Sequence, residues 1–299
     1  MTEPVDSATG PPAPGGGSGA VADRLVEVAR TGEDVDETAG GLFRLERPAV
    51  SGDRGAGAGG GVVVLLVHGS MDRATSFRRV MRHLPDVTVI TYDRRGYAGS
   101  VGVATSDDFA AQADDLLEVL DGRRAIGVGH SLGGNVVLAA AQRRLGLLEA
   151  LVVYETPQPW RPWWPTGTAG RRAVAEGGGD PGDVAEGFMR RMVGDRVWQS
   201  LPEATRRRRR QEGVALQAEM RALHHGRPFE PGAIEVPVVV AYGSEGSGHQ
   251  RRSAPALASE LPDGRLAEVA GAGHGVHLSH PEQLAALVRI AIGARQGRP

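Results

Sequence analysis

Cysteine and lysine are both missing from this chain of 299 residues, and only 4% of its residues are aromatic. Without cysteine, the chain can form neither a disulfide scaffold nor a thiolate metal site, and it holds no cysteine nucleophile. The 34 cationic side chains are all arginine, and 36 aspartates and glutamates leave a net charge of −2. Because nucleic-acid-binding proteins usually carry an excess of basic residues, this balance argues against a nucleic-acid partner.

Long apolar runs are also absent. A run such as residues 62–67 is far shorter than the ~20 residues that a membrane-spanning helix needs, so we expect no membrane partner. Residues 1–20 contain neither the basic segment nor the apolar segment of a secretory signal, and they are rich in Gly, Pro and Ser. We therefore expect a disordered tail on a cytoplasmic protein.

Short runs rich in valine, leucine and isoleucine recur from residue 61 onward. Such continuous runs are typical of strands buried on both faces of a parallel sheet. We predict strands at 62–67, 86–92, 124–128, 150–154, 236–242 and 265–269, with helices at 106–120, 132–145 and 281–295. This alternation predicts an α/β fold, a mostly parallel, doubly wound sheet with helices on both faces. An alternating segment at 41–46 is expected to pair with the edge of the sheet.

The regular alternation stops between residues 157 and 232. This interval holds all four tryptophans and two helical stretches, at 184–192 and 202–223. An insertion of this size between two strands is expected to form a helical cap over one end of the sheet. The organisation predicted is a disordered tail at 1–20, a core made of 21–156 and 233–299, and a cap at 157–232. Within the core we expect a short helix at 20–30 and a flexible loop at 51–61.

The most specific motif is G-H-S-L-G at residues 129–133, which lies between a predicted strand and a predicted helix. In that context the pattern G-x-S-x-G is typical of a nucleophile elbow, a sharp turn that exposes a serine hydroxyl. The flanking residues must be small because the turn is cramped, and the N-terminus of the following helix favours developing negative charge. We therefore predict that Ser131 is a nucleophile.

A second motif, H-G-S-M at residues 68–71, directly follows the strand predicted at 62–67. A tight turn there can aim the backbone N–H of Ser70 at the point that the N–H of Leu132 also faces. Two such donors form an oxyanion hole. We predict this role for Ser70 and Leu132, with Met71 and His130 beside them as substrate-binding residues.

Together with the loop Y-D-R-R-G-Y-A-G-S at 92–100 and the segment G-A-G-H at 271–274, these motifs resemble the α/β-hydrolase fold superfamily. The resemblance covers residues 61–295 apart from the cap, and the order of the motifs agrees with it. It implies a serine-nucleophile member with a helical cap and a base on a histidine that follows the last strand. His274 lies in a Gly-rich loop after 265–269 and is the expected base.

The acid that orients this histidine has two candidates, because the chain departs from the family pattern. Family members usually carry Asp in the turn after the strand at 236–242, where this chain has Gly246 and the neighbouring Glu245. The other candidate is Glu155, at the end of the strand at 150–154, a placement similar to that in some haloalkane dehalogenases. We favour Glu155, because an unpaired carboxylate at the end of a buried strand would be costly.

Histidines at every third position, His274, His277 and His280, raise the alternative of a metal site. No carboxylate or thiolate lies nearby at a recognised spacing, so we expect no metal and no cofactor. His277 and His280 are interpreted as ordinary residues of a loop and of a helix start.

A serine at the elbow supports acyl chemistry, whereas dehalogenases and epoxide hydrolases of this fold need Asp there. The predicted function is hydrolysis of an ester, lactone, thioester or related carbonyl compound through an acyl-enzyme, a carboxylesterase-like activity. Acyl transfer, C–C bond hydrolysis and perhydrolysis use the same constellation and stay open. A non-catalytic binding protein of this fold also stays open, because Asp is missing at its usual position.

The cap is expected to select the substrate, a small apolar carbonyl compound. Trp160, Trp163 and Trp164 either line its pocket or pack the cap onto the sheet. The five arginines at 206–210 form either a solvated face or a patch that guides an anionic substrate or a carrier protein. The oligomeric state is left open.

Overall fold

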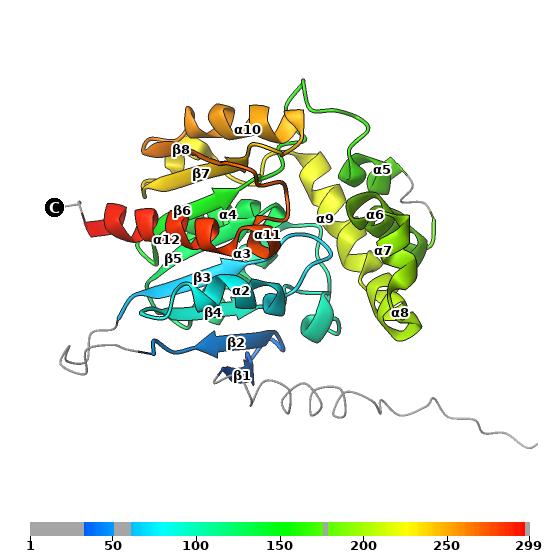
Figure 1. Ribbon diagram of the computed structural model, residues 1–299, viewed down its shortest axis with the longest axis horizontal. Coiled ribbons are helices and arrows are strands. Elements are labelled where there is room, and N and C mark those ends of the chain that lie inside the picture. Colours follow the sequence, from blue (N-terminus) through cyan, green and yellow to red (C-terminus); the bar gives the residue numbers. More distant parts are fainter. Residues whose placement is uncertain (1–32, 51–60, 176–178, 297–299) are drawn as a thin grey trace, which may run out of the picture.

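The computed structural model describes residues 33–50, 61–175 and 179–296. The tail predicted at 1–20, the helix predicted at 20–30 and nearly all of the loop predicted at 51–61 lie outside the described residues. The described part contains an eight-stranded sheet with helices against it (Figure 1).

The sheet has the strand order β1-β2-β4-β3-β5-β6-β7-β8. Its strands are β1 (Asp34–Glu37), β2 (Phe43–Arg47), β3 (Val63–Val67), β4 (Thr88–Tyr92), β5 (Ala125–His130), β6 (Leu148–Tyr154), β7 (Val238–Gly243) and β8 (Gly264–Val269). β2 pairs antiparallel with β1 and β4, and all other neighbouring strands pair in parallel. The mostly parallel sheet is confirmed, and the segment predicted at 41–46 does pair with its edge. β1, with the charged sequence D-V-D-E, is an addition to the prediction.

Helices cover both faces of this sheet, as predicted. Residues of α3 (Phe109–Leu120), α4 (Leu132–Arg143) and α10 (Gly248–Ala258) pack into one apolar cluster, and those of α2 (Arg78–Arg82) and α12 (Pro281–Gln296) into the other. The loops also contain α11 (Val276–Ser279) and the 3-10 turns η1 (Ala74–Phe77), η2 (Ala98–Ser100) and η3 (Pro231–Ala233). α3 begins at Phe109 rather than at 106, because the Asp108 side chain caps it by accepting the N–H of Ala110 at 2.8 Å.

The central strands are apolar throughout because both of their faces pack against helices. All five residues of β3 are buried. Leu65 and Val67 belong to the cluster that holds α3 and α4, whereas Val64 and Leu66 belong to the cluster on the opposite face. Successive side chains of a strand point to opposite faces, so one apolar run contributes to two cores.

A group of helices is inserted between β6 and β7: α5 (Ala169–Ala175), α6 (Pro181–Val193), α7 (Asp195–Ser200), α8 (Glu203–Gln211) and α9 (Gly213–His225). Figure 1 shows them gathered beyond one end of the sheet. The stretch predicted at 184–192 corresponds to α6, and the one predicted at 202–223 is divided into α8 and α9 at Glu212. Within the described ranges, no helix combines the length and the apolar character that crossing a membrane requires.

Candidate active site

Ser131 occupies the sharp turn between β5 and α4. Its backbone has φ 52° and ψ −124°, a conformation that residues other than glycine rarely adopt. Such a conformation costs about 1–3 kcal/mol and persists where the surrounding structure holds it. Here the Ser131 N–H donates to the Tyr154 carbonyl oxygen at 2.8 Å, which ties the turn to the neighbouring strand.

The glycines of the G-H-S-L-G motif are required by close backbone approach. A Cβ atom at Gly129 would lie 2.4 Å from the carbonyl oxygen of Gly133, and one at Gly133 would lie 2.3 Å from the carbonyl oxygen of Val67. Both distances are far below van der Waals contact with backbone atoms that have no room to move. The small flanking residues therefore allow α4 to start directly beside β3.

Ser131 lines a cavity with a volume of about 430 Å³. Most of the residues singled out from the sequence also line this cavity: Ser70, Met71, His130, Leu132, Glu155, Trp164 and His274. Five elements or their adjoining loops contribute these side chains, so the fold assembles the site from distant parts of the chain.

Glu155 is the carboxylate that meets His274. The Nδ1 atom of His274 lies 2.7 Å from Glu155 Oε2, and the Glu155 side chain is fully buried. The other carboxylate oxygen accepts the N–H of Gly243 at 3.1 Å. Gln250 Nε2 lies equally close to His274 Nδ1, but an amide nitrogen is itself a donor. A proton on Nδ1 is therefore shared with the carboxylate.

The departure from the family pattern at Gly246 has a steric explanation. A Cβ atom at Gly246 would lie 2.2 Å from Glu155 Oε1, so the Glu155 carboxylate fills the space of a side chain at this position. Glu245 does not line the cavity, and its N–H donates to the Ala272 carbonyl oxygen at 2.9 Å. Of the two candidate acids, the fold brings Glu155 to His274 and leaves Glu245 in the turn.

The loop after β3 brings Ser70 and Met71 to the cavity that Ser131 lines. Met71 has φ 57°, and its carbonyl oxygen accepts Arg209 Nη1 of α8 at 2.9 Å. Ser70 Oγ donates to Glu219 Oε2 of α9 at 2.8 Å. Met71, Ser131 and Glu155 are three of the five non-glycine residues with positive φ in the described part of the chain. Backbone strain is thus concentrated around this cavity, as it often is at functional sites.

Two buried histidines of the motifs are held neutral. His130 Nε2 lies 2.7 Å from the His274 carbonyl oxygen, which joins the elbow to the His274 loop. Burial, reinforced by the neighbouring rings of His277 and His274, lowers the pKa of His130 well below its usual value. Burial and the Arg94 guanidinium lower the pKa of His68 to about 3. Both rings therefore act as fixed hydrogen-bonding groups at neutral pH.

The three tryptophans singled out from the sequence, Trp160, Trp163 and Trp164, have different positions. Trp164 lines the cavity and packs edge-on against the His249 ring, with centroids 4.6 Å apart. Trp160 and Trp163, which were candidates either for lining the pocket or for packing the inserted segment, do not line the cavity. Trp160 packs against Phe229 in the apolar core, and Trp163 lies under the guanidinium of Arg252.

Sequence reasoning missed several residues of the site. Asp72 lines the cavity, and it could have been noticed because it directly follows the H-G-S-M motif. Glu219, which accepts the Ser70 hydroxyl, comes from the inserted helices, where no motif marks it. Arg209 lines the cavity and belongs to the run of five arginines at 206–210 that the sequence singled out. The inserted helices also supply apolar lining residues that only the folded chain identifies: Phe188, Met189, Met192, Val193, Met220 and Leu223.

The match to a known family agrees with this architecture. The model of the alpha/beta hydrolase family matches residues 64–287, which is most of the chain. The protein therefore belongs to the alpha/beta hydrolase family. The resemblance noted in the sequence and the prediction of an α/β-fold hydrolase are confirmed.

Individual relatives are more distant. The chain is 30% identical over 194 residues to the pimeloyl-[acyl-carrier protein] methyl ester esterase of Aromatoleum aromaticum, a match covering 56% of this chain and 74% of that protein. It is 38% identical over 100 residues to a Mycobacterium tuberculosis protein described as uncharacterized, and this match spans 32% of the chain and only 29% of that protein's length.

Solved structures of other proteins superpose over most of the chain. A thermophilic esterase from Thermogutta terrifontis has a TM-score of 0.64 at 22% identity, with 88% of this chain and 98% of that chain covered. The enol-lactonase from Burkholderia xenovorans LB400 has a TM-score of 0.63 at 19% identity, with 87% and 100% covered. At these identities the likeness concerns the fold alone.

Proposed function

We propose that this protein is a serine hydrolase that cleaves an ester, or a closely related carbonyl compound, through an acyl-enzyme on Ser131. His274 is the general base, and Glu155 is the acid that orients it. The observation that carries the proposal is the 2.7 Å contact between His274 Nδ1 and the buried Glu155 carboxylate, in the cavity that also contains Ser131.

The contact fixes which nitrogen of His274 is free to react. With the Nδ1 proton directed at Glu155, Nε2 carries the lone pair that can take the Ser131 proton as the hydroxyl attacks the carbonyl carbon. The carboxylate then stabilises the imidazolium that forms, and His274 returns the proton to the leaving group. Water repeats the sequence on the acyl-enzyme and releases the acid.

The negative charge on the carbonyl oxygen needs donors that are already in place. Leu132 is the first residue of α4, so its N–H is one of those a helix leaves without an internal partner. Ser70 lines the cavity from the loop after β3. We assign the oxyanion hole to the backbone N–H groups of these two residues, with Met71 and His130 bordering the substrate.

The cavity suits an apolar acyl group. Four of the six methionines of the chain line it, and methionine adapts to ligands of different shapes. Much of this apolar lining comes from α6 and α9, so we propose that residues 157–232 form a cap that selects the substrate. The similarity to a methyl ester esterase supports an ester as the substrate class. Acyl transfer, C–C cleavage and perhydrolysis would use the same residues, and analysis of the products distinguishes them.

The proposal is tested with p-nitrophenyl esters from acetate to dodecanoate, assayed with the wild type and Ser131→Ala. We expect kcat/KM to rise with chain length until the cavity is full and then to fall. The Ser131→Ala variant should lose at least ~10⁴-fold in kcat at every chain length. Comparable turnover by a correctly folded Ser131→Ala variant would refute the proposal.

A further inference from the structure

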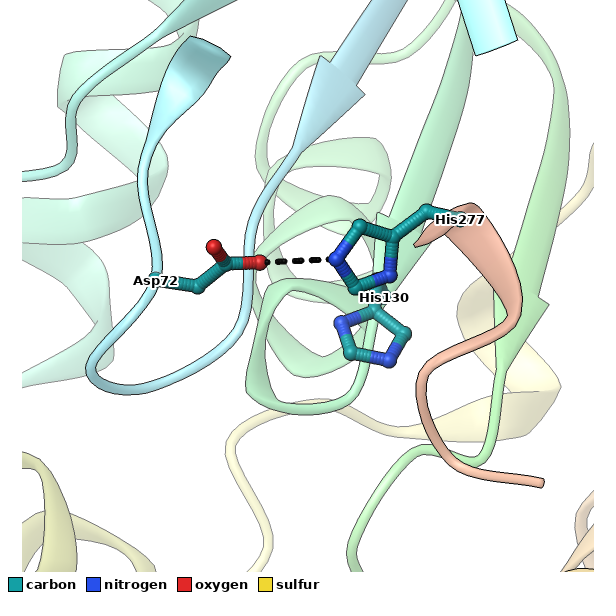
Figure 2. A group of neighbouring side chains, drawn as sticks. All are labelled: Asp72, His130 and His277. Carbon is teal, nitrogen blue, oxygen red and sulfur yellow. Dashed lines mark ion pairs between the residues drawn. The ribbon is translucent and has the colours of Figure 1, made fainter. Parts of the chain in front are cut away.

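We propose that Asp72, His130 and His277 form a binding site for one divalent transition-metal ion of the zinc type, beside Ser131. Figure 2 shows the three side chains turned toward one another, from the loop after β3, the end of β5 and α11. One possible ligand atom from each residue lies within 4.8 Å of those from the other two. The hydrolase mechanism proposed above places His130 beside the substrate, but neither it nor the family match gives the three residues together a role.

His130 supplies a ligand atom that has no other partner. Its Nε2 lies 2.7 Å from the His274 carbonyl oxygen, which can only accept, so the ring proton is on Nε2. Nδ1 is left with a bare lone pair, and this buried atom has no hydrogen-bond partner. In Figure 2 a ring nitrogen of His130 faces the Asp72–His277 pair. A metal-binding histidine usually donates its second N–H to a carbonyl or carboxylate, as His130 does here.

Asp72 and His277 already have the spacing of two ligands on one ion. His277 Nε2 lies 3.2 Å from Asp72 Oδ2. Two ligands of a tetrahedral zinc ion, each at about 2.0–2.1 Å, are separated by ~3.3 Å. Ser76 Oγ also lies 3.1 Å from Asp72 Oδ2.

The ion would replace the hydrogen bond between Asp72 and His277. The His277 proton moves from Nε2 to Nδ1, which has no partner in the structure, and the Nε2 lone pair then faces the metal. His130 needs a small shift to complete a set of two imidazoles and one carboxylate. Three protein ligands with a fourth position open to a cavity are typical of an accessible zinc site, and all three residues line the cavity.

The fold supplies the carboxylate ligand whose absence at a recognised spacing argued against a metal site in the sequence. No carboxylate lies near the histidines at 274–280 in the chain, but the fold brings Asp72 to His277 from the loop after β3. His280 takes no part, since its Nδ1 contacts Ser279 Oγ on the surface. The ligand set therefore differs from the His274, His277, His280 series that the spacing suggested.

Metal binding is measured on the untagged full chain after treatment with a chelator. Co²⁺ is titrated while its visible absorption is followed, and Zn²⁺ affinity is obtained by competition with a chromophoric chelator. We expect one ion per chain and the intense absorption of a tetrahedral Co²⁺ site. Asp72→Asn and His277→Gln should each weaken binding by more than the ~100-fold that loss of an outer-shell partner can cost.

His280→Gln is the matched control, because it removes a neighbouring, partly buried histidine outside the cluster. It should bind Co²⁺ as the wild type does, and circular dichroism establishes that each variant is folded. Absence of a stoichiometric Co²⁺ site in the wild type would overturn the proposal, as would tight binding by folded Asp72→Asn and His277→Gln. Because binding is read without substrate, the result does not depend on the proposed hydrolysis.

An effect on turnover follows if both proposals hold. The ion would lie in the same cavity as Ser131, so Zn²⁺ should inhibit the wild type reversibly and the chelator should restore activity. Asp72→Asn should bind Zn²⁺ weakly and resist this inhibition. If the protein hydrolyses esters and binds Co²⁺ at the cluster, but Zn²⁺ does not inhibit it, the metal-site proposal stands and only the predicted inhibition is wrong.

Discussion

The Glu155 carboxylate reaches His274 because glycine stands at position 246. Glu155 itself has φ 46°, so its backbone is strained, and its side chain is fully buried. A buried carboxylate without partners would be costly. The Gly243 N–H and the His274 imidazole satisfy the two carboxylate oxygens. The strained backbone of Glu155, its two hydrogen-bond partners and the lack of a side chain at Gly246 together bring the carboxylate to His274.

Exchanging the carboxylates for amides distinguishes the two candidate acids. Glu155→Gln should lower kcat by roughly 10³–10⁴-fold, because an amide no longer holds His274 in the reactive tautomer. Glu245→Gln should change kcat less than about two-fold, since Glu245 lies outside the cavity. Steady-state kinetics on one p-nitrophenyl ester, with thermal melts to check folding, measures both. The reverse ranking would assign the acid to Glu245.

Adding one methyl group at position 246 tests the steric argument. Gly246→Ala places a Cβ atom 2.2 Å from Glu155 Oε1, so the carboxylate must move away from His274. We expect kcat to fall at least ~10-fold and stability to fall by about 1–3 kcal/mol. Gly248→Ala is the control, because no atom lies within 4 Å of the added carbon. Equal kinetics for the two variants would contradict the account of Gly246.

Individual residues differ in how far the sequence could predict them. The elbow was predictable because its glycines and its serine stand within five consecutive residues, between a strand and a helix. The choice between Glu155 and Glu245 depends on how residues 155, 246 and 274 approach one another, and no local pattern encodes that distance. Asp72 was overlooked for the same reason, since only the fold brings it to His277.

At the scale of elements, α9 is bound to the loop after β3 through one buried carboxylate. Glu219 is 2% exposed and forms an ion pair with Arg94. It also accepts the hydroxyl groups of Tyr97 and Ser70, at 2.7 and 2.8 Å. This network connects the inserted helices with the loop to which we assign half of the oxyanion hole.

Removing the charge of Glu219 should lower the free energy of unfolding substantially. Glu219→Gln leaves the Arg94 guanidinium buried without a counter-charge, which typically destabilises a protein by about 3–5 kcal/mol. Glu203→Gln removes an exposed partner of Arg207 and should cost less than ~1 kcal/mol. Urea unfolding of both variants measures the difference. Equal stabilities would show that the buried pair contributes no more than the surface pair.

Elements were predicted best where their apolar pattern was continuous. The central strands were found because both faces are buried, which leaves an uninterrupted run such as that of β3. α10 was missed because its sequence is polar and contains Pro255, and β1 because its exposed strand is charged. The long helix predicted at 202–223 is two helices, which divide at Glu212. Gly213, the first residue of α9, approaches Pro181 too closely for any side chain.

At the scale of the whole molecule, an ion pair links β2, in the antiparallel edge of the sheet, to the segment that follows α3. Glu46 of β2 accepts two hydrogen bonds of 2.9 Å from Arg123, which follows α3. Burial raises the pKa of Glu46, but the hydrogen bonds and charge of Arg123, with the charge of Arg44, lower it overall below its usual value of 4.5. A carboxylate with a lowered pKa in the folded state stabilises the fold above its unfolded value and loses this contribution as the pH falls.

The pH dependence of global unfolding tests this link. Glu46→Gln should be less stable than the wild type at pH 7, and the difference should narrow as the pH falls through about 4.5 and below, because the wild-type carboxylate becomes protonated. Urea unfolding at a series of pH values gives the two curves. A difference that stays constant or widens toward acid would contradict the role of the ionised Glu46.

The central claim, that Ser131 is a nucleophile activated by His274, is tested most directly by fluorophosphonate labelling followed by mass spectrometry. We predict one phosphonyl group per chain, located on the peptide that contains Ser131. Labelling should be absent in Ser131→Ala and much slower in His274→Ala. A folded wild type that takes up no label, or a Ser131→Ala variant that takes it up at the wild-type rate, would contradict the account.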